Sequence, residues 1–239
     1  TADNVTLDCN AHTINGTVNK SIYVTGNNVT IRNCNIDITG DFGIYYDITS
    51  NGTINNNNIT ANEQVIRFES AHNNTISNNN ITSETHWGMY IRTSLDNNIT
   101  NNNVSASGWY GIFIYSSQYN NISNNNMSAV SAGLQLSGSS ENIISNNNVS
   151  AGNNYGIRLD SSSGYNTFLN NNITADDSKI IEDSTGTSYD NYLIYNNSFG
   201  QISWLNTSNI TINEMGTLAL GMNPIITNNS IYFNSSSLP

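Results

Sequence analysis

Apolar residues recur along this chain at a nearly constant interval. The phrase Asn74–Ile81 reads Asn-Thr-Ile-Ser-Asn-Asn-Asn-Ile and returns four more times with small changes, while looser copies lie on either side. The first apolar residues of the copies are spaced 22–26 residues apart and are Ile31, Ile54, Ile76, Ile99, Ile122, Ile144, Phe168 and Ile194. A fixed period of about 20–50 residues is typical of solenoid proteins. The pattern therefore predicts a repeat protein.

A second apolar pattern lies between these phrases, in short runs that mostly begin with Gly, such as Gly88–Ile91. Its first apolar column consists of Ile22, Ile44, Ile66, Met89, Ile112, Leu134, Ile157 and Ile180. Another apolar residue follows two positions later in most copies, and this alternation predicts strands with every second side chain directed inward. We expect two strand segments per repeat, each paired in parallel with its copy in the next coil.

The Asn triplets are predicted to form ladders, in which like side chains on successive coils hydrogen-bond to one another. Asn tolerates the left-handed backbone of tight turns, and its amide both donates and accepts. The sequons that end the triplets, such as Asn80 and Asn103, are then expected to be buried in these ladders and unavailable for modification.

The regular pattern weakens toward the C-terminus. Glu182 falls where Leu136 and Leu159 are expected to point inward, so we expect the register to slip there. We divide the chain into regular coils over 1–184 and irregular coils or a cap over 185–239, continuous with the same solenoid. Solenoids need atypical ends, because the ends would otherwise expose core and strand edges.

The phrases at Asn4–Ile14 and Asn28–Ile36 resemble the repeats of right-handed parallel β-helices. That superfamily includes pectate-lyase-like enzymes and NosD-type periplasmic proteins, and the Asn-rich, Ser-rich version is most similar to large archaeal cell-surface proteins. The resemblance implies an all-β, right-handed parallel β-helix of about ten coils with 22–24 residues each. Because this fold is a scaffold that carries many functions, the resemblance says little about activity.

Composition narrows the class of partner. A net charge of -11 and a pI near 4.3 make nucleic acid an unexpected ligand, since phosphate binding needs a basic patch. No apolar run approaches the ~20 residues of a membrane span. The sequence opens within a repeat-like phrase, so we expect a mature product or an excised piece of a longer chain.

The two cysteines, Cys9 and Cys34, lie 25 residues apart, which is close to one repeat. Neighbouring strands lie about 4.8 Å apart, and a disulfide accepts Cα separations of about 4.4–6.8 Å. Relative to Leu7 and Ile31, however, the cysteines are one column out of register, so a bond requires a local bulge. Two alternatives stay open: a disulfide, or two small buried side chains.

The commonest chemical motif is the N-glycosylation sequon Asn-x-Ser/Thr. Composition alone produces many matches in a chain in which about a fifth of the residues are Asn. Sequons in turns and near the chain ends are the better candidates, and they are Asn4, Asn15, Asn19, Asn28, Asn51, Asn73, Asn196, Asn206, Asn228 and Asn234.

An outward column on the second strand segment offers a candidate interaction surface. Its aromatic and basic members, which we expect to be exposed, are Tyr23, Tyr45, Arg67, Tyr90, Phe113 and Arg158. Aromatic and Arg side chains in a line suit sugar stacking or protein contact. His86-Trp87 and Trp109-Tyr110 lie just before two of these segments, where they either form an exposed aromatic corner or close a turn.

Catalysis and metal binding find less support. A glycoside hydrolase needs a pair of carboxylates, and Asp47 and Glu69 on neighbouring coils are equally readable as solvated charges. His12, His72 and His86 lack the spacing of a zinc site, and Met and His are too sparse to support copper. We therefore expect no catalytic, metal-binding or cofactor-binding residues and no enzyme activity.

The function expected from sequence is structural. We expect an extracellular glycoprotein that self-associates, head to tail or laterally, into a cell-surface layer, sheath or filament. A carbohydrate-binding adhesin module and a polysaccharide lyase or hydrolase are the two alternatives, and polysaccharide is the accompanying candidate partner.

Overall fold

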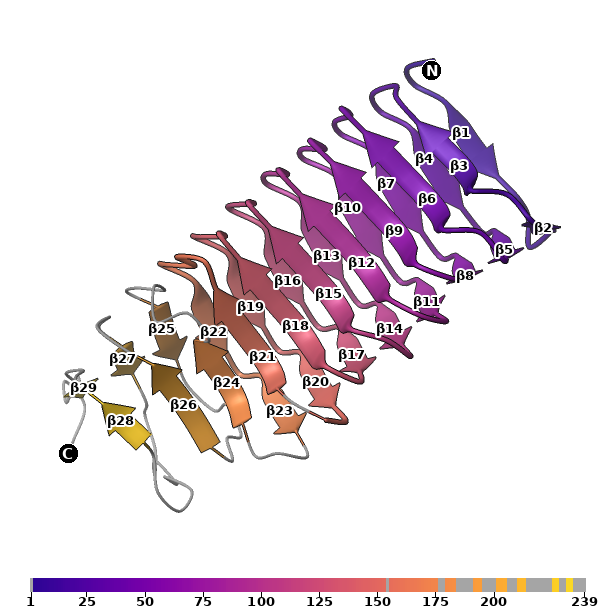
Figure 1. Cartoon of the computed structure of the whole chain (residues 1–239). Helices are drawn as coiled ribbons and strands as arrows, with labels where there is room; N and C mark the ends of the chain where they lie inside the picture. Colours follow the sequence, from indigo (N-terminus) through magenta and orange to yellow (C-terminus); the bar gives the residue numbers. More distant parts are fainter. Residues whose placement is uncertain are drawn as a thin grey trace.

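The computed structural model describes residues 2–153 and 155–175, and beyond them the backbone of strands within 179–183, 191–194, 201–205, 210–213, 225–227 and 231–233. The described residues are all-β, and their strands stack in parallel into a right-handed β-solenoid. The N- and C-termini lie at opposite ends of the rod (Figure 1). These residues contain no helix that is long and apolar enough to cross a membrane.

Three parallel sheets run along the rod, and each of the first eight coils gives one strand to each sheet, whereas β25–β29 belong to sheets A and C alone. Sheet A comprises β1 (Thr6–Asp8), β4 (Thr30–Arg32), β7 (Thr53–Asn55), β10 (Thr75–Ser77), β13 (Asn98–Thr100), β16 (Asn121–Ser123), β19 (Ile143–Ser145), β22 (Thr167–Leu169), β25 (Asn191–Ile194), β27 (Ile210–Asn213) and β29 (Ile231–Phe233). Sheet B comprises β2 (Thr13–Gly16), β5 (Asn35–Ile38), β8 (Asn58–Ala61), β11 (Asn80–Ser83), β14 (Asn103–Ala106), β17 (Asn126–Ala129), β20 (Asn148–Ala151) and β23 (Asn172–Ala175). Sheet C comprises β3 (Lys20–Val24), β6 (Phe42–Asp47), β9 (Gln64–Glu69), β12 (Trp87–Arg92), β15 (Tyr110–Tyr115), β18 (Ala132–Ser137), β21 (Tyr155–Asp160), β24 (Lys179–Asp183), β26 (Gln201–Leu205) and β28 (Ile225–Thr227).

The prediction of two strand segments per repeat was wrong, because the Asn phrase itself contains two strands. Ile76 lies in β10 of sheet A, and Ile81 lies in β11 of sheet B. Asn78, between them, takes a left-handed backbone with φ of 57°. Asn is one of the few residues that adopt this conformation readily, so the first Asn of each triplet turns the chain from one sheet to the next.

The backbone register agrees with the predicted apolar columns through residue 175. After that residue, the observed register is shifted by one position. Ile157 pairs with Ile181 rather than with Ile180, so Glu182 faces Arg158. Phe168 likewise pairs with Leu193 rather than with Ile194. The expected slip near Glu182 is therefore present. Strands β25–β29 extend sheets A and C, while the division at residue 184 stays a prediction.

The core is a narrow column of aliphatic side chains from all three sheets. Its sheet A residues are fully buried from Ile31 through Phe168, and each stacks on its counterpart one coil away, as in the pairs Ile76–Ile99 and Ile99–Ile122. Gly88 keeps space for this core, because a Cβ there would meet Val104 Cγ1 at 2.2 Å. Burial of aliphatic surface favours the coil by about 25 cal/mol per Å².

Ladders of buried polar side chains run through the corners between the sheets. One contains the middle Asn of each triplet and joins Asn57, Asn79, Asn102, Asn125, Asn147 and Asn171. A second ladder joins Asn74, Asn97, Asn120, Asn142 and Asn166. Each of these side-chain amides also hydrogen-bonds to backbone N–H or C=O groups of the turns. Without these bonds, the backbone groups would be buried without partners.

The last Asn of each triplet is exposed, so the prediction that these sequons are buried was wrong. They do form a ladder, in which Asn103 Nδ2 donates to Asn80 Oδ1 at 2.8 Å and Asn126 Nδ2 donates to Asn103 Oδ1 at 2.8 Å. Because each begins a strand of sheet B with its side chain outward, the ladder lies on the surface of the rod.

The structure contains a disulfide between Cys9 and Cys34, with a Cα–Cα distance of 4.7 Å. The one-column offset between the two cysteines is accommodated by a longer turn in the first coil. Four residues connect β1 to β2 there, whereas only two connect β4 to β5 in the second coil. Asn10 and Ala11 make the extra turn with left-handed backbones. Cys34 occupies the middle position of its own triplet and donates its backbone N–H to Asn57 Oδ1 at 3.0 Å, so the disulfide caps the first Asn ladder.

Candidate ligand-binding face on sheet C

The outer surface of sheet C carries the predicted interaction column. Backbone pairing places its members in one line, in the order Tyr23, Tyr45, Arg67, Tyr90, Phe113, Gln135 and Arg158. Tyr23 is 46% exposed, but Tyr45 and Gln135 are buried and the other members are half-buried. The expectation of a fully exposed column was therefore wrong, because side chains of neighbouring columns cover it.

A second outward column, which the sequence reading did not single out, supplies this cover. It contains Lys20, Phe42, Gln64, Trp87, Tyr110, Ala132 and Tyr155. Its signal in the sequence is position: each member lies two residues before the first inward residue of the strand, as Trp87 lies before Met89.

Aromatic rings form a continuous cluster over β12 and β15. Trp87 lies 4.9 Å from Tyr90 and 6.5 Å from Tyr110 between ring centroids. Phe113 lies 5.2 Å from Tyr90 and 5.9 Å from Tyr115. Centroid distances of 4.5–7 Å are typical of favourable aromatic pairs, so these rings stabilise one another as well as covering the sheet.

Trp109 extends this cluster into solvent. It is 55% exposed at the turn before β15, and its ring lies 6.2 Å from Tyr110 and 6.1 Å from His86. His86-Trp87 and Trp109-Tyr110 therefore form an aromatic corner in which Trp109 alone is exposed, while His86 and Trp87 are half-buried and Tyr110 is buried.

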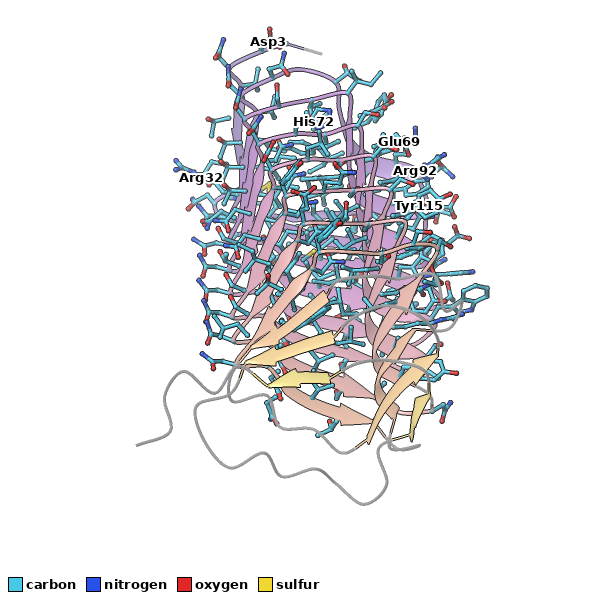
Figure 2. The ribbon with its side chains drawn as sticks, turned by 90° about the vertical axis from the view of Figure 1, so that its left-hand side faces the viewer. Asp3, Arg32, Glu69, His72, Arg92 and Tyr115 are labelled. Atoms are coloured by element: carbon cyan, nitrogen blue, oxygen red, sulfur yellow. A yellow bond between two sulfur atoms is a disulfide. The ribbon has the colours of Figure 1, made fainter. Side chains whose placement is uncertain are left out.

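Charged side chains alternate with the rings. Arg67 contacts Glu69 at 2.8 Å, and Arg92 contacts the same carboxylate at 3.4 Å. The Arg67 guanidinium also lies 5.0 Å from the ring centroid of Tyr45 and 5.4 Å from that of Tyr90, within the range of cation–π attraction. Glu69, Arg92 and Tyr115 follow one another along one side of the rod, with Arg32 on the opposite side (Figure 2).

Basic residues are concentrated on this sheet. The chain has six Lys and Arg against 17 Asp and Glu, and five of the six lie on sheet C strands: Lys20, Arg67, Arg92, Arg158 and Lys179. Arg32, on β4 of sheet A, is the other one. The same strands also carry five acidic residues, Asp47, Glu69, Asp160, Glu182 and Asp183, so their formal charges balance, in contrast to the net charge of -11 of the whole chain.

Burial changes the acidity of the tyrosines on this face. Removal from water raises the pKa of Tyr45, Tyr90 and Tyr110, because the charged phenolate loses hydration. The pKa of Tyr23 is raised chiefly by its hydrogen bond to Asp47, in which the hydroxyl donates at 2.5 Å. All four phenols are therefore held as neutral hydrogen-bonding groups.

The described carboxylates of the sheet C face form hydrogen bonds or ion pairs with neighbouring side chains of the same face. Asp47 accepts from Tyr23, and Glu69 contacts Arg67 and Arg92. Asp160, at the far end of the same outward column, accepts from Gln135 Nε2 at 2.7 Å. The column Asp47–Glu69–Arg92–Tyr115–Ser137–Asp160 is in register from coil to coil, whereas Asp183 pairs with Leu159 and lies outside it.

Metal-ligating side chains lie apart from one another. Among the described residues, no three His, Cys, Asp or Glu side chains come together as a metal site. His12 Nδ1 lies 2.7 Å from Cys9 O, His72 Nδ1 accepts from the backbone of Leu95 at 3.0 Å, and the cysteines form the disulfide. Met89 and Met127 are fully buried in the core.

The predicted glycosylation sites are separate from this face. Asn4, Asn15, Asn19, Asn28, Asn51 and Asn73 are all exposed. Asn28 Nδ2 donates to Asn4 Oδ1 at 3.0 Å, and Asn19 donates to Asp41. Asn196, Asn206, Asn228 and Asn234 lie outside the described residues.

Known structures share the fold of this chain. A double mutant of the periplasmic alginate epimerase AlgG matches with a TM-score of 0.59 and 18% identity over 88% of this chain. Tailspike protein 2 of the Escherichia coli bacteriophage CAB120 matches with a TM-score of 0.52 and 15% identity over 97% of this chain. The alignments cover 48% and 41% of those two proteins, so this chain spans about half of their length or less. No curated protein sequence matches the chain.

The family model described as periplasmic copper-binding protein (NosD) matches residues 2–142 and 120–216. Copper is held in proteins by imidazole, thiolate or thioether ligands. The described His, Met and Cys side chains do not fit such a site, because the histidines are dispersed, the methionines are in the core and the cysteines are bonded to each other. The matched length and the parallel β-helix together establish the family: this chain belongs to the NosD family.

Proposed function

We propose that this chain is a polysaccharide-binding β-solenoid of the cell envelope or exterior, with the outer face of sheet C as its binding face. One observation carries the proposal. An acidic chain gathers five of its six basic residues and a continuous aromatic cluster on a single sheet.

The chemistry of this face suits a sugar polymer. Sugar rings present C–H groups that stack on aromatic faces, and the Trp109 and Tyr115 rings are open to solvent. Arg67 and Arg92 supply planar donors for hydroxyl or carboxylate groups. Trp87 Nε1 and Arg92 Nε are buried and have no hydrogen-bond partner among the described residues. Because the coils repeat at about 4.8 Å, a linear ligand along the axis meets one residue of each outward column at every coil.

The comparisons support this proposal without deciding it. One protein of similar fold is an epimerase of alginate, which is a polysaccharide, and that protein and the NosD family are both described as periplasmic. The prediction that the chain is not an enzyme stays a prediction. The engaged carboxylates of sheet C give no pair that we assign to catalysis.

Affinity electrophoresis and calorimetry test the proposal with alginate, polygalacturonate, cellulose fragments and chitin fragments. We expect at least one polysaccharide to retard the protein. The double variant Trp109→Ala, Tyr115→Ala removes the two most exposed rings of the cluster and is expected to weaken binding about tenfold or more. As a control, Ile48→Asn replaces a 76% exposed side chain in a left-handed turn outside the aromatic cluster and leaves this binding unchanged. Absence of retardation by every polysaccharide, or equal binding by the double variant, would overturn the proposal.

A second function, as a structural building block of a surface layer, sheath or filament, is favoured by a different observation. Sheet B presents a ladder of exposed amides, from Asn58 through Asn172, with Ser or Thr two positions after each. Such repeated donors and acceptors suit lateral contact between two rods. Negative-stain microscopy is expected to show bundles or filaments, and only single short rods at high concentration would contradict this role.

A further inference from the structure

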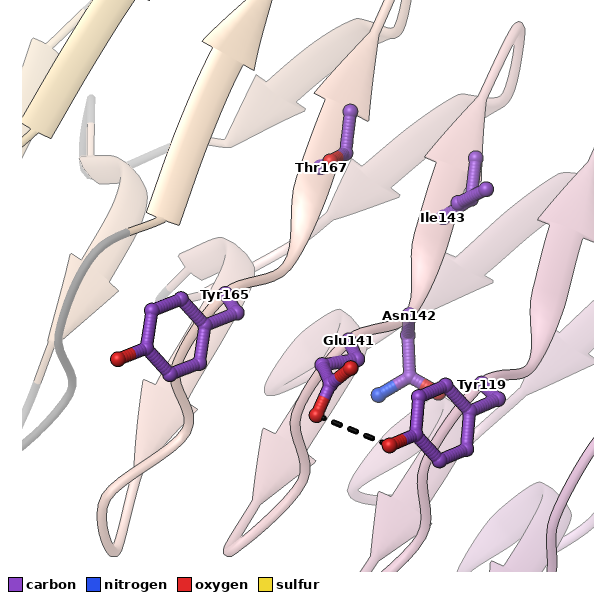
Figure 3. A pocket seen from close by; sticks show the side chains of 6 residues that line it. All are labelled: Tyr119, Glu141, Asn142, Ile143, Tyr165 and Thr167. Carbon is purple, nitrogen blue, oxygen red and sulfur yellow. Dashed lines mark hydrogen bonds between the residues drawn. The ribbon is translucent and has the colours of Figure 1, made fainter.

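A hollow lies at the corner where the chain passes from sheet C to sheet A. It has a volume of about 500 Å³. The side chains that line it, drawn in Figure 3, are Tyr119, Glu141, Asn142, Ile143, Tyr165 and Thr167. None of these residues belongs to the outer face of sheet C, so the hollow is separate from the site proposed above.

Three of the lining residues occupy the same position in successive coils. Tyr119, Glu141 and Tyr165 each lie three residues before the sheet A core residue of their coil, and all three have left-handed backbones with φ of 53–58°. Earlier coils have Asn at this position, at Asn51 and Asn73. Asn adopts this conformation more readily than Tyr or Glu does. In this part of the rod, larger side chains therefore occupy a position that Asn would fill with less backbone strain.

The two tyrosines form an open pair of ring surfaces. Tyr119 is 49% exposed and Tyr165 is 44% exposed. Both rings are seen face-on in Figure 3, with Glu141 between them. They lie two coils apart, about 9.5 Å along the axis at the spacing of parallel strands. That separation is close to the length of an extended disaccharide unit, so two sugar rings one disaccharide apart would each meet one of the two tyrosines.

Glu141 gives this hollow a negative charge. Tyr119 donates its hydroxyl to Glu141 Oε1 at 3.2 Å, which raises the pKa of the phenol. Within the described part of the chain, no Lys, Arg or His lies within ion-pair distance of Glu141. A charged donor on a ligand therefore finds a carboxylate that no protein cation has neutralised.

We propose that this corner binds a glycan that contains amino sugars with free amino groups. Two sugar rings of the glycan stack on Tyr119 and Tyr165, and a protonated amine of the intervening unit contacts Glu141. The ammonium–carboxylate contact is the selective element, because charge-assisted hydrogen bonds are about twice as strong as neutral ones. Ile143, which is 49% exposed, adds an apolar contact beside the rings.

Calorimetry with a β-1,4-linked glucosamine hexamer tests the proposal, with the N-acetylglucosamine hexamer and cellohexaose as neutral ligands of equal length. The wild-type protein is expected to bind the glucosamine hexamer about tenfold or more tightly than either neutral ligand. Glu141→Gln is expected to remove this preference, and added salt is expected to weaken the interaction.

Tyr119→Asn and Tyr165→Asn are each expected to weaken binding about tenfold. These variants install the residue that the same turn has at Asn51 and Asn73, so they are expected to keep the thermal stability of the wild type. Ile48→Asn, at an exposed left-handed turn outside both proposed sites, serves as the control that retains binding at this corner. No binding of the glucosamine hexamer, binding equal to that of cellohexaose, or binding unaffected by Glu141→Gln would overturn the proposal, whatever the result on sheet C.

Discussion

Asn79 and Asn102, on successive coils, are joined by two hydrogen bonds to a single oxygen. The backbone N–H and the side-chain Nδ2 of Asn79 both donate to Asn102 Oδ1, each at 3.0 Å. Asn102 Nδ2 in turn donates to Ile76 O at 2.9 Å and to Asn125 Oδ1 at 3.0 Å. The side chain of the middle Asn therefore joins three coils in a corner from which water is excluded.

Asn102→Ala is expected to destabilise the rod by about 3 kcal/mol, because it leaves buried donors and acceptors on two coils without partners. Chemical denaturation followed by circular dichroism measures this loss. Asn103→Ala provides the matched control, because Asn103 belongs to the same triplet but its ladder lies in solvent. That change is expected to cost less than about 0.5 kcal/mol. Equal effects of the two substitutions would contradict the assignment of the middle Asn as the buried one.

The double variant Cys9→Ser, Cys34→Ser is expected to loosen the first coil. The disulfide closes a loop of 25 residues, and such a cross-link is worth about 3 kcal/mol in the chain-entropy model. Because solenoid coils contact only their neighbours, the loss is expected to be local. Hydrogen exchange should show β1, β2 and β3 losing protection while β12 and β15 retain it. Uniform loss along the rod would contradict this expectation.

Alkaline pH is expected to unfold the rod as its tyrosines ionise. Burial raises the pKa of Tyr45, Tyr46, Tyr90 and Tyr110 above the usual value near 10. Because the folded chain holds these protons more tightly than the unfolded chain does, their contribution to stability is intact below about pH 10 and is lost as pH rises through the folded values. Tyrosinate absorbance and circular dichroism should change together. Full ionisation near pH 10 with the β-sheet signal intact would show that these phenols are accessible.

N-glycosylation is proposed at exposed turn sequons, with Asn51 and Asn73 as its clearest candidates. Both lie outside the hydrogen-bonded Asn ladder of sheet B. In that ladder Asn103 Nδ2 donates to Asn80, and the glycan would have to attach to this nitrogen. Glycopeptide mass spectrometry of protein from its native source should find sugar on the turn sites in preference to the ladder sites. An intact mass equal to that of the bare polypeptide would contradict the proposal.

Much of the sheet C face follows from register alone. The line from Tyr23 to Arg158 is predicted by counting one residue past each inward position, and the backbone pairs agree. The covering column of Trp87 and Tyr110 is available by the same count. The corner position of Tyr119 and Tyr165 is likewise three residues before each sheet A core residue. Neither set is conspicuous in sequence, because the residue at each position differs from one coil to the next.

Exposure does not follow from register. Tyr45 and Gln135 belong to the same outward column as Tyr23, yet both are buried. Tyr45 is covered by Phe42 on its own strand and by Arg67 on the next coil. The size and rotamer of those neighbouring side chains decide how far an outward residue is buried. The repeat period of the sequence specifies neither of them.

The sequence by itself determined the pitch, the parallel pairing and the aliphatic columns, because like residues at a constant interval can all be buried in only one register. The tertiary structure decided which Asn of each triplet is buried, because the left-handed turn at residues such as Asn78 interrupts the alternation of side chains. It also decided that Cys9 reaches Cys34, through an extra turn that no period predicts. Beyond Phe168 the tertiary structure also decided which apolar residue pairs with the preceding coil. It selects Ile181 and Leu193, each of which has an apolar neighbour that the sequence pattern would equally allow.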